Sequence, residues 1–270
     1  MIEIRDDVGR DIVLAHPAHR IVSLVPSLTE TVFAFGCGAA VVGVTRYCTE
    51  PAGAVERVEK VGGTKNPDLA RIRALRPDAV LMNAEENRKE DFEALERAGL
   101  PLFVSFPQRA RDVVGLLNRL GVLTGATAAA QRIGAALVQT LEARERLHEP
   151  SPVRVFCPIW KNPWMSFNGD TYADDMLWTA GGQNVCRDRA ERYCTVSLPE
   201  VAAAQPDVIL LPDEPYVFRE KDLADLTPLH DTPAYRAGRI HFIDGKALSW
   251  YGPRTAPGLR YLQSLICPDR

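Results

Sequence analysis

Short apolar runs alternate with segments of helical periodicity along the first 120 residues of this chain. The apolar runs lie at residues 20–25, 41–44, 78–82 and 101–105. Amphipathic segments follow them, at 27–36, 67–76, 87–99 and 111–121. This alternation predicts a mostly parallel α/β sheet. Before it, residues 2–14 alternate around a turn at Asp6–Gly9 and predict a small hairpin.

The expected helix ends follow from local chemistry. Ser27-Leu-Thr-Glu30 has the spacing of a capping box, and Pro67 is expected at a first helical position, where its missing N–H costs nothing. Asn87 is expected to cap the helix that closes at Gly99, and the next helix is expected to end at Gly121.

Ala126–Glu149 is the longest helical segment. It contains one glycine, no proline and a high share of alanine, and it stops at Pro150-Ser-Pro152. At 1.5 Å per residue, about 22 residues span roughly 33 Å. We therefore expect an N-terminal α/β lobe over residues 1–123, a rigid bridging helix over 124–150 and a C-terminal α/β lobe over 151–270.

The strand–helix alternation resumes in the second half. Strands are expected at 153–159, 207–211 and 239–243. Thr171 and Asp174 are expected to begin a helix that ends at Gly181, and two more helices are expected at 199–205 and 256–266.

One segment of the first half resembles one of the second. Leu69–Leu81 and Leu198–Leu210 each read as a short helix, a Pro-Asp turn and a buried strand. The match predicts two related Rossmann-like lobes. Two such lobes joined by one long helix leave a cleft, and small-molecule sites favour domain interfaces.

Composition narrows the function classes. The net charge of −3 gives no reason to expect nucleic acid or an anionic membrane as partner, and no apolar run approaches a membrane span. The nucleophile elbow G-x-S-x-G and the phosphate-binding loop G-x-x-x-x-G-K-[ST] are both missing. We therefore expect a binding protein without a covalent cofactor, not an enzyme.

The cysteines and the N-terminus bear on the compartment. Six cysteines without C-x-x-C spacing favour free thiols in a reducing compartment. The first ten residues carry acidic groups where a signal peptide needs basic and apolar stretches. The expectation is a cytoplasmic protein. The alternative is a periplasmic or cell-surface protein whose leader has been trimmed.

Several motifs in order resemble the class III substrate-binding proteins of cobalamin and ferric-siderophore ABC transporters. They are Asp6–Arg10, Arg20–Glu30, Val42–Thr45, Gly62-Gly63-Thr64, the Pro77-Asp78 strand and Ala180–Asn184. Glu85–Asp91 and Trp250–Thr255 are similar to a subgroup described as helical-backbone metal receptors. The resemblance implies two α/β lobes bridged by a rigid helix. It also implies a corrinoid such as cobalamin, an iron chelate or haem in the cleft.

Candidate ligand residues lie in loops after strands. The resemblance places Tyr47 where cobalamin-binding relatives have a stacking aromatic side chain, next to Arg46, and Tyr193 at the corresponding position of the second lobe. Two aromatic faces clamp a flat macrocycle with little loss of entropy. The alternative for each tyrosine is packing on the surface.

The other candidates are weighed against structural roles. Trp160, Trp164, Trp250 and Tyr251 are expected in the cleft or in the core. Arg254 is suited to an anionic group of the ligand or to a surface salt bridge. Glu85 and Glu86 are expected to contact a ligand or metal, or only to favour the start of a helix.

Cys48 follows Tyr47 and Cys194 follows Tyr193, so two thiolates would flank one metal if the lobes face each other. Inert buried thiols are the alternative. The function hypotheses are therefore a corrinoid or iron-chelate binding protein, an intracellular metal or redox sensor using these cysteines, and an enzyme acting on a bound tetrapyrrole.

The resemblance also implies a docking glutamate for the permease on each lobe. The matching positions hold Ala70 and Pro199, and Glu200 lies about 100° further round its helix. We therefore expect no docking to a standard ABC permease.

Overall fold

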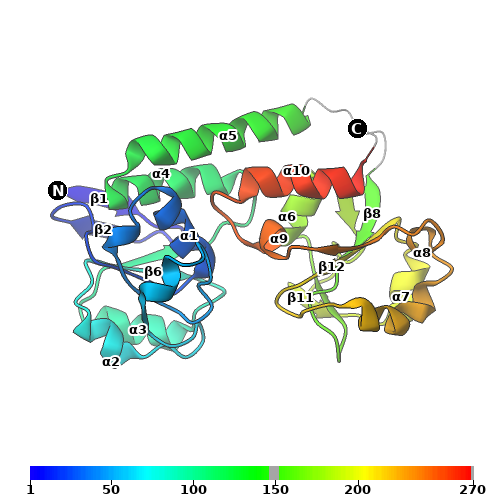
Figure 1. The fold of residues 1–270 in the computed structure, drawn as a ribbon, viewed down its shortest axis with the longest axis horizontal. Helices are drawn as coiled ribbons and strands as arrows, with labels where there is room; N and C mark the ends of the chain where they lie inside the picture. Colours follow the sequence, from blue (N-terminus) through cyan, green and yellow to red (C-terminus); the bar gives the residue numbers. More distant parts are fainter. Residues whose placement is uncertain (146–151, 269–270) are drawn as a thin grey trace. The chain divides into compact units, whose positions relative to one another are not determined.

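The computed structural model describes residues 1–145 and 152–268. The chain divides into two compact units (Figure 1). The N-terminal unit comprises Met1–Pro107, Arg111–Val138 and Tyr251–Pro253; the C-terminal unit comprises Gln108–Ala110, Gln139–Trp250 and Arg254–Arg270. The last stretch of the expected bridging helix, 146–150, lies outside the described residues.

A five-stranded parallel sheet forms the centre of the N-terminal unit. Its order is β5 (Glu59–Lys60), β4 (Val41–Val44), β3 (Ile21–Ser23), β6 (Ala79–Asn83) and β7 (Leu102–Ser105). Residues of β3, β6 and β7 are fully or almost fully buried, as expected for strands covered on both faces. The expected parallel α/β sheet is confirmed.

Helices cover this sheet. They are α1 (Pro26–Ala34), α2 (Leu69–Ala74), α3 (Lys89–Arg97), α4 (Asp112–Thr124) and α5 (Thr127–Glu145), with short 3₁₀ turns η1 (Gly38–Ala40) and η2 (Val55–Arg57). Figure 1 shows α2 and α3 on one side of the sheet and α4 on the other. Helix α5 belongs to the N-terminal unit through Val138 and to the C-terminal unit from Gln139.

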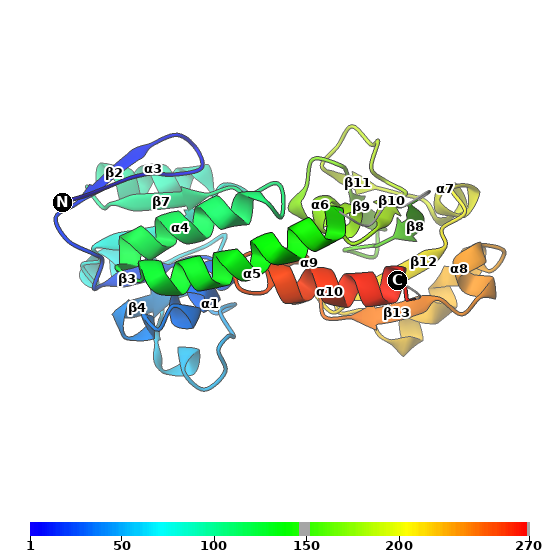
Figure 2. The same cartoon turned by 90° about the horizontal axis from the view of Figure 1, so that it is seen from above.

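The expected hairpin is present as β1 (Ile2–Arg5) and β2 (Asp11–Leu14), and it lies along β7 (Figure 2). Asp6 is buried in its turn, and its carboxylate accepts hydrogen bonds from the backbone N–H groups of Val8, Arg10 and Val104. The Asp7 backbone N–H donates to the Val104 carbonyl. The turn therefore fastens the hairpin to the edge strand β7.

The C-terminal unit has a four-stranded parallel sheet. Its order is β10 (Gly182–Asn184), β8 (Val153–Phe156), β12 (Val208–Pro212) and β13 (Ile240–Ile243). Beside it, β9 (Met165–Phe167) and β11 (Tyr193–Thr195) pair antiparallel. The helices are α6 (Tyr172–Thr179), α7 (Leu198–Ala203), η3 (Glu220–Leu229), α8 (Pro233–Arg236), α9 (Lys246–Ser249) and α10 (Thr255–Ile266). No helix in the described ranges has the length and apolar character needed to cross a membrane.

The sequence repeat extends to individual hydrogen bonds. In the N-terminal unit, the Asp78 carboxylate accepts from the Arg20 N–H, and the Arg20 guanidinium donates to the Leu75 carbonyl. In the C-terminal unit, Asp207 accepts from the Arg154 N–H, and Arg154 donates to the Ala204 carbonyl. The residues before the two prolines, Arg76 and Gln205, both have φ near +45 to +49°. The two units therefore share one arrangement, in which an arginine binds both the aspartate of a Pro-Asp turn and a nearby backbone carbonyl. We call this arrangement the clamp.

Three expected helix starts are wrong. Helix α1 begins at Pro26, one residue before Ser27, so Ser27 lies inside the helix and makes no capping bond. Asp68, not Pro67, precedes α2, and its side chain accepts from the Arg71 N–H. Arg88 precedes α3 without a side-chain cap, because the Asn87 side chain is used elsewhere. By contrast, Thr171 caps α6 as expected.

The expected end of α4 is also wrong. Gly121 lies inside the helix, which continues to Gly125 at φ +73°. A Cβ atom on Gly121 would lie 2.5 Å from the Cβ of Ala130 on α5. Gly121 therefore allows two helices to approach closely and does not end one of them.

Candidate functional site

In both units, the loops that follow the parallel strands carry most of the residues expected from the sequence. After β4, Tyr47 is 55% exposed and its N–H donates to the Thr45 hydroxyl. The Arg46 guanidinium lies 5.9 Å from the centre of the Tyr47 ring, and the Arg46 N–H donates to the Gly62 carbonyl. This loop therefore presents an exposed aromatic face with a cation beside it.

Cys48 lies beneath this loop. It is 2% exposed, and its sulfur is 3.2 Å from the hydroxyl oxygens of both Thr29 and Thr45. Burial raises the pKa of the Cys48 thiol, and the neutral thiol is a poor metal ligand. Among residues 1–145 and 152–268 no group of three or more His, Cys, Asp or Glu side chains is arranged to hold a metal ion. The metal role of Cys48 and Cys194 stays a prediction.

The loop after β6 carries Glu85 and Glu86. Their backbone N–H groups donate to Asn83 Oδ1 at 2.8 and 3.0 Å, and the Lys65 ammonium donates to the Glu85 carbonyl. Both side chains are partly exposed. The backbone of this loop is therefore held in place by hydrogen bonds, and Glu85 and Glu86 are both partly exposed.

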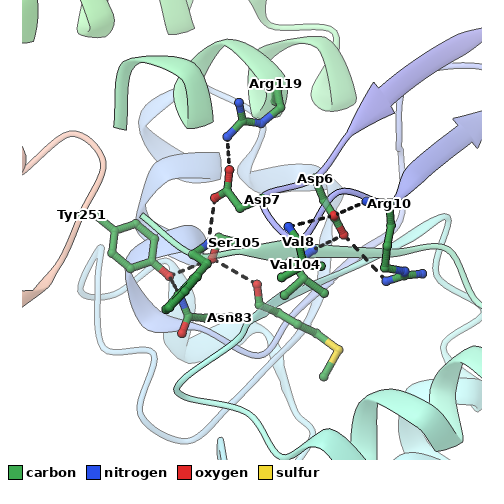
Figure 3. Close-up of polar contacts among 11 residues, drawn as sticks. Asp6, Asp7, Val8, Arg10, Asn83, Val104, Ser105, Arg119 and Tyr251 are labelled. Atoms are coloured by element: carbon green, nitrogen blue, oxygen red, sulfur yellow. Dashed lines mark hydrogen bonds and ion pairs between the residues drawn. The ribbon is translucent and has the colours of Figure 1, made fainter. Parts of the chain in front are cut away.

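Tyr251 comes from far along the chain but belongs to the N-terminal unit. It is 5% exposed, and its hydroxyl lies 2.9 Å from Asn83 Nδ2 and 2.9 Å from Ser105 Oγ (Figure 3). These contacts give it a structural role at the ends of β6 and β7. Contact between Tyr251 and a ligand stays a prediction. Sequence reasoning missed Asn83 and Ser105, although each is a polar residue at the end of an apolar strand.

Four aromatic side chains lie together after β8 and β12 of the C-terminal unit. Trp160 meets Tyr216 edge to face at 5.7 Å, Tyr216 lies 4.7 Å from Phe218, and Phe218 stacks on Trp164 at 5.8 Å. Trp160 is 43% exposed, whereas Phe218 is buried and Trp164 packs against the core. Trp160 therefore provides the accessible face of this aromatic group and Trp164 its support.

An ion-pair network fixes the Trp160 loop. The Lys161 ammonium donates to the Asp222 carboxylate at 2.6 Å and also contacts Asp225. Tyr216 donates its hydroxyl proton to Asp222 as well. Bonds to Asp222 and then to Asp225 raise the pKa of Lys161, so the pair stays charged. Sequence reasoning missed Tyr216. The sequence signal that could have indicated it is the Glu-Pro-Tyr segment directly after a buried strand.

Tyr193 lies on β11, where side chains alternate between two faces. Tyr193 is 46% exposed, while Cys194 is 3% exposed and belongs to the core cluster that also holds Cys186. Burial raises the pKa of the Cys186 thiol to about 11. This strand therefore offers Tyr193 to solvent and places the neighbouring thiol inside.

Trp250 and Arg254 belong to the C-terminal unit. Trp250 is 8% exposed, with the Lys246 ammonium 5.2 Å and the Arg254 guanidinium 5.6 Å from its ring. Arg254 also pairs with Asp244 at 3.6 Å. Trp250 is therefore mostly enclosed. A ligand contact by Trp250 or Arg254 stays a prediction.

Comparisons with known proteins agree on one family. The family model described as periplasmic binding protein matches residues 21–247. The vitamin B12-binding protein of Yersinia pestis (strain Pestoides F) is 28% identical over 198 residues, covering 73% of this chain and 70% of the relative.

Solved structures give the same result. The periplasmic vitamin B12 binding protein of Vibrio cholerae superposes with a TM-score of 0.82 at 22% identity, over 93% of this chain and 97% of that one. The periplasmic heme-binding protein of Roseiflexus sp. RS-1 gives 0.80 at 27% identity, over 92% and 98%. The likeness to helical-backbone metal receptors stays a prediction. The resemblance to class III substrate-binding proteins is confirmed, and this chain belongs to the periplasmic binding protein family, in its class III branch.

Proposed function

We propose that this chain binds a flat, metal-bearing macrocycle, a corrinoid or an iron chelate such as haem, and does not catalyse a reaction. The observation that carries the proposal is that each unit exposes an aromatic face in a braced loop near its parallel strands. Tyr47 does so beside Arg46, and Trp160 does so on the support of Tyr216. The names of the vitamin B12-binding and heme-binding relatives support the ligand class.

Physical chemistry favours a planar ligand for such faces. An aromatic ring buries a large area against a flat macrocycle and loses little rotational freedom, because it has only two side-chain torsions. Arg46 and Arg254 supply guanidinium groups suited to an anionic group of the ligand, such as the carboxylates of haem. Tyr193 adds an exposed ring on β11.

Calorimetric titration with cyanocobalamin, cyanocobinamide and haemin tests this proposal. We expect micromolar or tighter binding of at least one of them, which corresponds to about −8 kcal/mol. Tyr47→Ala and Tyr193→Ala are each expected to weaken binding by about 1–3 kcal/mol. Tyr235→Ala, at an exposed tyrosine on the short helix α8, is the matched control and is expected to bind like the wild type. Absence of binding to all three probes would refute the proposal.

We further propose that the protein does not dock to a standard ABC permease. Ala70 and Pro199 are exposed second residues of α2 and α7, where the resemblance implies docking glutamates. Glu200 is no substitute, because its carboxylate accepts from the Ser197 N–H in a capping box and pairs with Arg189. Complementary charge steers and orients such encounters, so its loss weakens docking.

A pull-down with a cobalamin-type permease in detergent tests this second proposal. The wild type is expected to show no specific retention, and the double variant Ala70→Glu, Pro199→Glu is expected to gain it. Retention of the wild type at the level of an exported relative would contradict the proposal. Cytoplasmic residence is proposed with it, and cell fractionation with an antibody to the protein checks that.

A further inference from the structure

The hydroxyl of Tyr251 lies at the junction of β6 and β7, away from solvent. It contacts Asn83 and Ser105, which are paired neighbours at the ends of these strands (Figure 3). Gly252 follows it at φ +117°, and a Cβ atom there would lie 2.3 Å from the Thr31 hydroxyl. The segment Tyr251–Pro253 is therefore seated closely in the N-terminal unit.

The hydrogen-bond directions in this group follow from counting protons. Ser105 donates its one hydroxyl proton to the Met82 carbonyl at 3.1 Å. With the Ser105 proton on the Met82 carbonyl, Tyr251 donates to Ser105 Oγ and accepts from Asn83 Nδ2, and Asn83 Nδ2 also donates to Ser105 Oγ at 3.3 Å. Burial, and then the nearby charge of Glu86, raise the pKa of Tyr251 well above its usual value, so the phenol keeps the proton that this direction requires.

The direction of these bonds decides which way the Asn83 amide faces. With Nδ2 bound to Tyr251, Oδ1 faces the following loop and accepts from the N–H groups of Glu85 and Glu86. A flipped amide would place its NH₂ group against those two N–H donors. Tyr251 and Ser105, which both accept from Asn83 Nδ2, therefore stabilise the one amide orientation that holds the loop, and Tyr251 makes the shorter bond.

Asn87 completes the attachment of this loop. Its Oδ1 accepts from the Asn83 N–H at 2.8 Å, and its Nδ2 donates to the carbonyls of Thr64 at 3.0 Å and Leu24 at 3.4 Å. The loop after β6 is thereby joined to the residue after β3 and to the loop after β5. This explains why Asn87 is buried and does not cap α3.

We propose that Tyr251 is a positioning residue for ligand binding. By orienting the Asn83 amide together with Ser105, it helps to fix the loop that presents Glu85 and Glu86. The inference rests on the proposed function, because it assumes that this loop meets the ligand. It assigns to Tyr251 an action through other residues instead of a direct contact.

The first test needs no ligand. Amide hydrogen exchange at Glu85 and Glu86 is measured in the wild type, in Tyr251→Phe and in Tyr172→Phe. Tyr172 is the matched control, because it is a buried tyrosine of the C-terminal unit whose hydroxyl lies 2.9 Å from the Thr255 hydroxyl. Exchange at Glu85 and Glu86 is expected to be about tenfold faster in Tyr251→Phe only, as for loss of one hydrogen bond. Equal rates in all three proteins would overturn the inference.

The second test measures affinity for cyanocobinamide and haemin. Tyr251→Phe is expected to weaken binding of the probe that the wild type binds by about tenfold, with no change in Tyr172→Phe. In a Glu85→Gln, Glu86→Gln background, the loss of affinity caused by Tyr251→Phe is expected to be smaller, because the loop no longer carries the two carboxylates that Tyr251 helps to position.

The outcomes separate the two claims. If the wild type binds a probe and Tyr251→Phe binds it equally well, the positioning role is refuted while the proposed function stands. If the wild type binds none of the three probes of the calorimetric titration, the proposed function fails. Hydrogen exchange alone then decides whether Tyr251 fixes the loop.

Discussion

Strand β6 of the N-terminal unit and strand β12 of the C-terminal unit begin alike and end differently. Before each strand, the aspartate of a Pro-Asp turn accepts a hydrogen bond from the backbone N–H of an arginine, Arg20 or Arg154. After β6, Asn83 holds a loop with two glutamates. After β12, the chain continues through Glu214 and Pro215 into the aromatic residues Tyr216 and Phe218.

This contrast separates scaffold from site. The shared clamp joins neighbouring strands at their amino ends, where it depends only on the repeat. The carboxyl ends carry the acidic and aromatic residues, and ligand sites in open α/β sheets are usually found at these ends. The N-terminal unit also takes Tyr251–Pro253 from the far end of the sequence. Of the two units, the N-terminal one is therefore completed by a segment from far along the sequence.

The largest expected effect comes from disturbing that distant segment. Gly252→Ala places a Cβ atom against the Thr31 hydroxyl at a positive φ, so we expect a loss of about 2–5 kcal/mol in the free energy of unfolding. Gly36→Ala is the matched control, because its φ is also positive but nothing lies within 4 Å, and it should cost about 1–2 kcal/mol. Denaturant unfolding measures both. Equal losses would mean that the close approach to Thr31 does not matter.

A pH effect is expected in the C-terminal unit. The Asp174 carboxylate is buried beside Arg187, and burial raises its pKa to about 6 despite that partner. The folded protein therefore binds this proton more tightly than the unfolded chain. Stability contributed by protonated Asp174 is present at low pH and is lost as pH rises from about 4 to about 6, by about 1–3 kcal/mol.

Unfolding free energies between pH 4 and pH 7 check this sign. The difference between wild type and Asp174→Asn should shift against the wild type as pH rises. Asp222 has a lowered pKa because its bond to Lys161, with other hydrogen bonds, outweighs the raising effect of burial. The stability that its charge contributes is therefore lost only below about pH 4, so Asp222→Asn should show no comparable slope between pH 4 and pH 7. A profile for Asp174→Asn that runs parallel to that of Asp222→Asn over this range would show that the folded protein does not bind the Asp174 proton more tightly than the unfolded chain does.

The smallest expected effects concern the hydrogen bonds that the two units have in common. Asp78→Ala and Asp207→Ala each remove the acceptor for an arginine N–H, so each should cost about 1–2 kcal/mol of unfolding free energy. The two losses should be alike and should add in the double variant, because the sites lie in separate units. A much larger loss in one unit would show that the clamps are not equivalent.

The sequence predicts the repeated elements well, because apolar periodicity and Pro-Asp turns are local signals. It also predicts the loops that carry Tyr47 and Trp160, whereas Tyr193, expected in a loop, lies on the short strand β11. It misplaces the ends at Ser27 and Gly121, because a proline at the first helical position and a close helix–helix contact outweigh the local capping signals. The short strands β9, β10 and β11 are too brief to show periodicity.

The polar group around Tyr251 shows a different limit. Asn83 and Tyr251 are 168 positions apart, and nothing local to either residue indicates the other. Asn87 has the spacing of a helix cap, yet its bonds go to Asn83, Thr64 and Leu24. Long-range hydrogen bonds of this kind are set by tertiary structure, so the local pattern of a single sequence does not predict them.

The position of Tyr251 in the chain also sets an order of completion during synthesis. Ribosomes release the N-terminal residues first, and early domains begin to fold while later ones are still being made. The sheet of the N-terminal unit, with β3 to β7, emerges early, but the partner of Asn83 and Ser105 is among the last twenty residues of the 270. All residues of the N-terminal sheet are therefore synthesised well before Tyr251 can contact Asn83, and truncation before Tyr251 removes one of the contacts that hold the Glu85–Glu86 loop.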